Sequence, residues 1–157
     1  MTRTCFLVVI ALLGAAGAYA QSQDVERKYV IDERGRERAF SRAVSTIGGE
    51  IVWLAGQTAT VSANGGSLTG DFEGQTREIF RILSERLSGV GGSLSDIVTM
   101  TVYISDTRYG DQFVDLRKQY FDNDQFPSSA LITVVGFARP EILIEIKATA
   151  VVAVDGG

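Results

Sequence analysis

The spacing of hydrophobic positions along the chain predicts two amphipathic helices. Between Asp71 and Leu87 apolar side chains recur every three or four residues opposite a charged stripe. Asp71 is the expected N-cap of this helix, and Gly89 is expected to end it. The segment Tyr109–Phe121 has the same period and predicts the second helix.

Alternating and β-branched runs predict strands at Lys28–Asp32, Ala39–Ile47, Glu50–Ala55, Asp96–Ser105, Ser129–Val135 and Ile142–Val154. Gly48-Gly49 lies between two of these runs and predicts a hairpin, because both glycines can take positive φ. The charged stretch Asp32–Arg38 predicts a turn. The resulting order β-β-β-α-β-α-β-β predicts a single α+β domain, with a mixed sheet and two helices on one face.

The last predicted strand has two different faces. One is wholly apolar and is expected under the helices: Ile142, Ile144, Ile146, Ala148 and Ala150. The other mixes apolar, polar and charged side chains: Leu143, Glu145, Lys147, Thr149 and Val151. Ser129, Leu131 and Thr133 alternate in the same mixed way, and we expect them to share the face of Glu145. A mixed face of this kind often meets a partner subunit or lines a cleft.

Residues 1–20 have the pattern of a secretory signal peptide. Arg3 precedes the apolar run Cys5–Leu13, and Ala18-Tyr19-Ala20 fits the small-x-small pattern before a cleavage point. Cleavage after Ala20 predicts a periplasmic or secreted protein that begins at Gln21. The alternative is a membrane anchor, but a spanning helix needs about 20 apolar residues, so we expect no membrane association after cleavage.

Three segments follow from these patterns. Residues 1–20 are the expected signal peptide, 21–38 an N-terminal lead-in with the first strand, and 39–154 the main domain.

Composition excludes several kinds of active site. The chain has no His and a single Cys, which lies in the expected signal peptide, so Ser-His-Asp and Cys-His devices and His-ligated metals are ruled out. Without Arg3 the chain has 14 basic and 19 acidic side chains, a net charge of −5, which argues against nucleic acid as a partner. Asp122-Asn123-Asp124 lacks the Gly and Glu of a calcium loop, so no metal site is predicted.

Glu145 is the sharpest catalytic candidate among the remaining side chains. On the mixed strand face its carboxylate could hold or activate a water molecule in a partly closed site. The alternative is an exposed ion pair with Lys147, two residues further on, which would contribute little to stability.

Four blocks of the sequence resemble the RidA/YjgF family of reactive-intermediate imine deaminases: Glu50–Gln57 (EIVWLAGQ), Gly70–Gln75 (GDFEGQ), Gly91–Asp106 (GGSLSDIVTMTVYISD) and Pro140–Val151 (PEILIEIKATAV). The resemblance covers about Ala39–Val154. It implies a chorismate-mutase-like (RidA-like) α+β subunit and a homotrimer with ligand clefts between subunits. Active relatives hydrolyse enamines and imines to 2-oxo acids and ammonia without a cofactor or metal.

The resemblance also implies roles for single residues. Ser129 stands where the deaminating branch has an Arg that binds the substrate carboxylate, and Phe40 stands where that branch has a Tyr. Glu145 is retained, and Arg42 could supply a replacement cation. We therefore take Glu145 as the candidate catalytic residue and Phe40, Arg42 and Ser129 as candidate substrate-binding residues. Two functions remain open: a cofactor-independent imine or enamine hydrolase, and a non-catalytic trimer that binds a small molecule or another partner.

Overall fold

A computed structural model describes residues 24–154. Its elements are β1 (Glu26–Val30), α1 (Glu33–Arg38), β2 (Ala43–Ile47), β3 (Glu50–Gln57), α2 (Phe72–Ser88), the 3-10 helix η1 (Leu94–Asp96), β4 (Ile97–Ile104), α3 (Tyr109–Arg117), β5 (Ser128–Thr133) and β6 (Ile144–Val152). The signal peptide expected at residues 1–20 lies outside the described residues. In the described part of the chain, no helix is long and apolar enough to cross a membrane.

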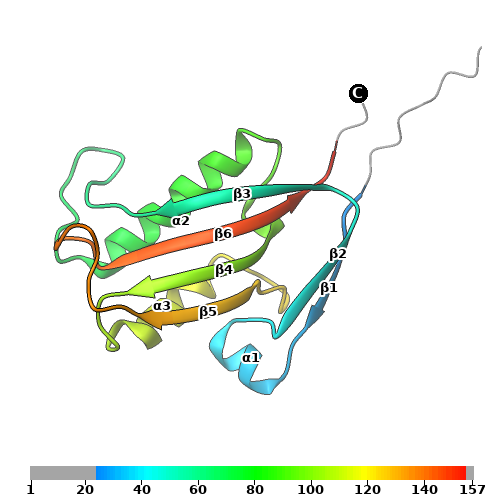
Figure 1. The fold of residues 1–157 in the computed structure, drawn as a ribbon, viewed down its shortest axis with the longest axis horizontal. Coiled ribbons are helices and arrows are strands. Elements are labelled where there is room, and N and C mark those ends of the chain that lie inside the picture. The colour runs from blue at the N-terminus through cyan, green and yellow to red at the C-terminus, as the bar shows by residue number, and fades with distance from the viewer. Residues whose placement is uncertain (1–23, 155–157) are drawn as a thin grey trace, which may run out of the picture.

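The main sheet has four strands in the order β3-β6-β4-β5. The pairs β3–β6 and β4–β6 are antiparallel, whereas β4 and β5 are parallel, so the sheet is mixed. Helices α2 and α3 lie together behind this sheet, and β1 and β2 form a separate two-stranded sheet beside it (Figure 1). The predicted α+β architecture, with two helices on one sheet face, is confirmed.

The core lies between the helices and the apolar face of β6. The apolar stripe of α2 is buried, as its period predicts: Phe72, Ile79, Phe80, Leu83 and Leu87. The predicted inner face of the last strand is buried with it: Ile142, Ile144, Ile146, Ala148 and Ala150. The Asp71 side chain accepts a hydrogen bond from the Gly74 amide at 2.9 Å, which confirms it as the N-cap.

The N-terminal segment differs from the prediction at two places. Gly48 and Gly49 do not join a hairpin: β2 pairs with β1, and β3 pairs with β6. The glycines instead form the corner between the two sheets, where a Cβ on Gly49 would lie 2.8 Å from the Val152 carbonyl oxygen. The charged stretch predicted as a turn is helix α1, because the Asp32 side chain caps it by accepting from the Gly35 amide at 2.7 Å.

The expectation that Ser129 and Glu145 share a sheet face is wrong. Ser129 is in parallel register with Met100, which is buried under the helices, so Ser129, Leu131 and Thr133 face the helix layer. Glu145 pairs with Tyr103 on the opposite, open face. Side chains along a strand alternate between the two faces of a sheet, so a shift of one residue in register moves each side chain to the opposite face. Both faces of β5 carry apolar side chains, and the sequence pattern therefore does not reveal which face lies under the helices.

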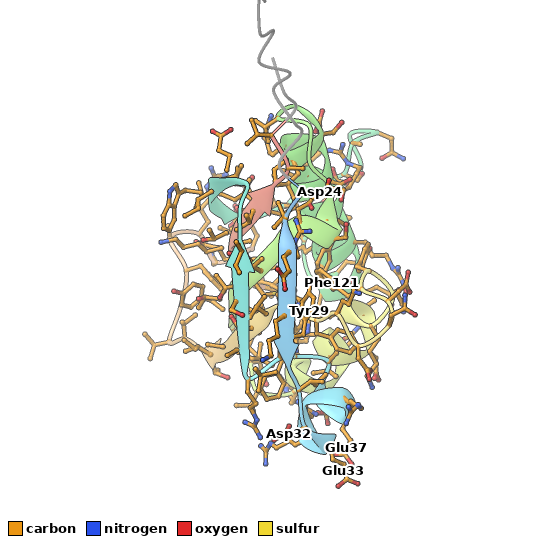
Figure 2. All side chains as sticks on the ribbon, turned by 90° about the vertical axis from the view of Figure 1, so that its right-hand side faces the viewer. Asp24, Tyr29, Asp32, Glu33, Glu37 and Phe121 are labelled. Atoms are coloured by element: carbon orange, nitrogen blue, oxygen red, sulfur yellow. The ribbon has the colours of Figure 1, made fainter. Side chains whose placement is uncertain are left out.

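The β1–β2 hairpin is fixed to the edge of the molecule by polar contacts. Arg27 forms an ion pair of 2.6 Å with Asp96 and also donates to the Val151 carbonyl oxygen. In the edge-on view, the chain runs from Asp24 through β1 down to Asp32, the N-cap of α1 (Figure 2). This attachment holds α1 and the segment after it beside β5, an edge strand of the main sheet.

Candidate functional site

A cavity of about 430 Å³ lies where α1, the segment after it, α3 and β5 meet. It is lined by four arginines, one serine and three apolar side chains: Arg34, Arg38, Arg42, Arg117, Ser129, Phe40, Val114 and Leu131. This volume suits a small organic molecule. The three predicted substrate-binding residues, Phe40, Arg42 and Ser129, therefore meet at one cavity.

Backbone pairing at Ser41 brings these residues together. Ser41 forms a parallel bridge with Ser128, and its amide donates to the Pro127 carbonyl oxygen at 3.1 Å. Ser41 is buried, so its neighbours Phe40 and Arg42 flank the start of β5. Ala39 ends α1 in the left-handed conformation, with φ of 54°, and turns the chain into this pairing.

Arg117 forms the buried floor of the cavity. It is the last residue of α3 and is only 2% exposed, yet none of the ion pairs among residues 24–154 includes it. Its guanidinium lies 5.1 Å from the centre of the Phe113 ring, and its Nε has no hydrogen-bond partner in the described structure. Burial, and then the nearby charge of Arg38, lowers the pKa of Arg117 to about 10.

Arg117 and Ser129 form a polar pair inside the cavity. Arg117 Nη1 donates to Ser129 Oγ at 2.7 Å, and Nη2 donates to the Arg38 carbonyl oxygen at the same distance. Since the serine oxygen accepts from a cation, its own O–H remains available to donate to another group. The guanidinium thus comes from α3 at the place where the resemblance implied an arginine on β5.

The other three arginines stand at the rim. Arg38 is paired with Asp111, and Arg42 Nε donates to Asp32 at 2.9 Å while its guanidinium lies 5.0 Å from the Phe40 ring centre. The Gly35 amide and then Arg42 lower the pKa of Asp32. Arg34 is exposed and forms no ion pair within the described part of the chain. Arg42, the predicted replacement cation, is therefore neutralised locally, whereas Arg34 and Arg117 are not.

Glu145 lies in a different hollow, on the open face of the sheet. That hollow has a volume of about 360 Å³ and is lined by Tyr103, Val134, Gly136, Phe137, Ala138, Glu145 and Lys147. Because Ser129 and Glu145 face opposite sides of the same sheet, one chain cannot bring both to one ligand. A site that uses both groups needs a second copy of the chain.

Gly56 gives the Glu145 carboxylate its position. A Cβ at residue 56 would overlap Glu145 Oε1 and lie 2.9 Å from its Cδ. Because Gly56 has no side chain, the Glu145 carboxylate can lie against β3 at this position.

We expect Gly56→Ala to displace the Glu145 carboxylate with little loss of stability, because the colliding group is the end of a flexible side chain. Any activity that depends on Glu145 should fall at least about tenfold, since small misplacements of a reacting group are costly. Activity assays with thermal unfolding as the control would check this. Gly89→Ala, where φ is −64° and the nearest atom to a Cβ would be the Arg86 carbonyl oxygen at 3.4 Å, is the matched variant. Equal activities for the two variants would contradict the positioning role of Gly56.

Arg117, Arg34 and Gly56 were not among the predicted site residues. A signal for Arg117 was present: it follows Phe113 by four residues and precedes Tyr120 by three, so it lies on the apolar stripe of the predicted helix. A charged residue on such a stripe is expected to be buried, which is unusual and points to a functional role.

Within residues 24–154, no group of three or more acidic, Cys or His side chains could hold a metal ion.

Comparisons with known proteins agree with this architecture. The family model described as Endoribonuclease L-PSP matches residues 32–152. A RutC family protein of Pyrococcus horikoshii is 28% identical over 111 residues, which cover 71% of this chain and 85% of that protein.

Among solved structures, a conserved Rid family protein of unknown function from Yersinia pestis is 26% identical, with a TM-score of 0.71 over 80% of this chain and 98% of that one. A member of the YjgF family from Mycobacterium tuberculosis is 27% identical, with a TM-score of 0.57 over 81% of this chain and 100% of that one. The resemblance drawn from the four sequence blocks is confirmed. The chain belongs to the Endoribonuclease L-PSP family, which is the family of the Rid and YjgF proteins.

Proposed function

We propose that the protein binds a small anionic metabolite in a cleft between two copies of the chain and hydrolyses an imine or enamine there. The observation that carries this proposal is the buried guanidinium of Arg117, which has no carboxylate partner among residues 24–154 and faces a cavity beside Phe40 and Ser129. A buried cation without a counter-ion is costly in a folded protein, and an anionic ligand would compensate it.

The reaction follows from the groups on the two sheet faces. Arg117 and the Ser129 hydroxyl hold the carboxylate of the substrate by charge-assisted hydrogen bonds. Glu145 of a second copy orients a water molecule, which adds to the carbon of the C=N bond while the carboxylate accepts its proton. The proton passes to the nitrogen and gives the carbinolamine. Its hydroxyl proton then moves to the nitrogen as the C–N bond breaks, and a 2-oxo acid and ammonia leave. An enamine enters this sequence after its methylene carbon takes a proton from water and its nitrogen loses one, which gives the imine. Each step is general acid–base catalysis by one carboxylate.

The open face of the sheet supports assembly. Trp53 is 77% exposed, and the register of β3, β6, β4 and β5 puts Ile51, Tyr103 and Ile132 on the same side. A sheet face that exposes several large apolar side chains favours association with copies of itself.

We expect protein lacking residues 1–20 to run as a homotrimer in multi-angle light scattering, and Trp53→Glu to shift it towards monomer, because a charge would be buried at the subunit contact. Val90→Glu, on an exposed site after α2, is the matched control. A wild-type monomer at micromolar concentration would contradict the cleft between copies.

The catalytic proposal is tested by releasing 2-aminoacrylate in situ with a pyridoxal-phosphate dehydratase and measuring how fast 2-oxo acid and ammonia appear. Acceleration by the trimer, lost in Glu145→Gln, supports the proposal. The second candidate is a non-catalytic binding trimer, which is favoured by Ser129 and Phe40 standing in place of the Arg and Tyr of the deaminating branch. It predicts anion binding without acceleration.

The ribonuclease in the family description is a weaker candidate. Arg34, Arg38, Arg42 and Arg117 line one compact cavity of about 430 Å³, whereas single-stranded RNA binds along an extended basic groove. The net charge of −4 also disfavours binding to an RNA backbone.

Export is part of the same proposal. Expressed with its leader in a bacterium, the protein should be recovered outside the cytoplasm with Gln21 as its first residue. N-terminal sequencing of the periplasmic and cytoplasmic fractions checks this. An intact leader on cytoplasmic protein would contradict it.

A further inference from the structure

The cavity at Arg117 has an excess of positive charge. Four arginines line it, and two of them are neutralised by carboxylates, Arg38 by Asp111 and Arg42 by Asp32. Arg117 and Arg34 have no carboxylate partner among residues 24–154, so two uncompensated cations face one small space.

These two cations differ in depth and come from different elements. Arg117 lies at the floor at the end of α3, whereas Arg34 is exposed on α1 at the rim. A ligand that compensates both must place negative charge at the floor and at the mouth of the cavity. The walls between them are the apolar side chains of Phe40, Val114 and Leu131.

The acidic residues of α1 do not cancel this charge inside the cavity. Glu33 and Glu37 line a neighbouring hollow, which shares Arg34 and Arg38 with the cavity. Figure 2 shows Asp32, Glu33 and Glu37 together at the lower end of the molecule. None of Glu33, Glu37 and Asp111 lines the cavity floor.

We propose that the cavity selects a small dianion, with one anionic oxygen pair at Arg117 and Ser129 and the second negative charge at Arg34. This inference rests on the proposed anion-binding cleft and specifies its ligand class. Dicarboxylates and phosphate monoesters both carry two negative charges. The charges are separated in a dicarboxylate and lie on one group in a phosphate monoester. A single carboxylate would satisfy Arg117 alone.

The experiment is calorimetric titration of the trimer with acetate, malonate and inorganic phosphate at matched ionic strength. Malonate or phosphate should bind on the order of tenfold tighter than acetate, because a second charged contact is added. A preference for malonate over phosphate would identify separated charges, and the reverse preference a single doubly charged group.

Variants assign the two contacts. Arg34→Gln should lower dianion affinity about threefold to tenfold and leave acetate affinity within about twofold, as expected for an exposed cation. Arg36→Gln is the matched control, since Arg36 is on the same helix but pairs with Asp124 outside the cavity. Ser129→Ala should weaken all three anions, because it removes the hydroxyl donor.

The outcomes separate this inference from the proposed function. Acetate binding as tightly as malonate and phosphate, with Arg117→Met weakening all of them, would overturn the dianion preference and leave the anion cleft standing. Failure of all three anions to bind the trimer would overturn both. An Arg36→Gln effect as large as that of Arg34→Gln would reduce the rim contact to general electrostatic attraction and overturn the role of Arg34.

Discussion

Replacing Arg117 with methionine is expected to remove anion binding while leaving the protein about as stable as the wild type. Affinity should fall about tenfold to a hundredfold, because charge-assisted hydrogen bonds to a carboxylate are lost. Methionine keeps an unbranched, apolar side chain of similar length at a position that is 2% exposed.

The stability expectation follows from the charge of Arg117. Its pKa is lowered from the usual range of arginine to about 10, which corresponds to a cost of roughly 3 kcal/mol for holding the cation in the fold. At neutral pH the guanidinium is protonated in both the folded and the unfolded chain. The cost is therefore fully present and is relieved only as the pH rises through about 10.

Methionine removes this cost and also the hydrogen bonds to Ser129 Oγ and the Arg38 carbonyl oxygen, each of which contributes about 1.5 kcal/mol because the donor is charged. The two effects nearly cancel, so the Tm should change by less than about 5 °C. Thermal unfolding together with calorimetric titration checks both parts, and Arg81→Met on the exposed surface of α2 is the control for an arginine-to-methionine change. A variant that unfolds, or one that keeps full affinity, would contradict the assigned role.

Glu145→Gln is expected to abolish hydrolysis while leaving anion affinity unchanged. The amide keeps the shape of the side chain but cannot accept the proton of water, and loss of a general base typically costs about 100-fold to 10,000-fold in rate. Affinity should be preserved, because Arg117 and Ser129 hold the anion, whereas Glu145 of the second copy contacts the attacking water. Lys147→Gln, in the same hollow, is the control for a changed charge on the open face.

Single-turnover rates and titrations of the same preparations separate the two effects. A Glu145→Gln variant with the wild-type rate would exclude Glu145 as the water-activating group. A variant that loses affinity and rate together would mean that Glu145 contacts the anion itself.

The fold was predictable from the sequence because its patterns are local. The spacing of apolar residues shows which face of α2 and which face of β6 is buried, and both faces are buried as expected. The Gly48-Gly49 corner was misassigned as a hairpin, because positive φ serves a tight turn and a sharp corner equally well. Only the pairing of β2 with β1 distinguishes them.

The site was predictable only in part, for a tertiary reason. Resemblance identified Phe40, Ser129 and Arg42, which do line one cavity. The guanidinium at its floor comes from α3, twelve residues before Ser129 in the chain, and the contact exists only because α3 packs across β5. Sequence alternation also could not assign Ser129 and Glu145 to opposite faces, because that depends on the parallel register of β4 and β5.

The central claim is that one copy supplies the anion pocket and a second copy supplies Glu145. Arg117→Met and Glu145→Gln proteins can be unfolded, mixed in equal amounts and refolded together, and assayed at a substrate concentration well below the wild-type KM, where each variant alone retains little of the wild-type rate. In a threefold-symmetric trimer, random mixing leaves about one quarter of the sites with both residues intact. Recovery of about a quarter of the wild-type imine hydrolysis is the predicted result. A mixture as inactive as either variant refolded alone would contradict a site shared between copies.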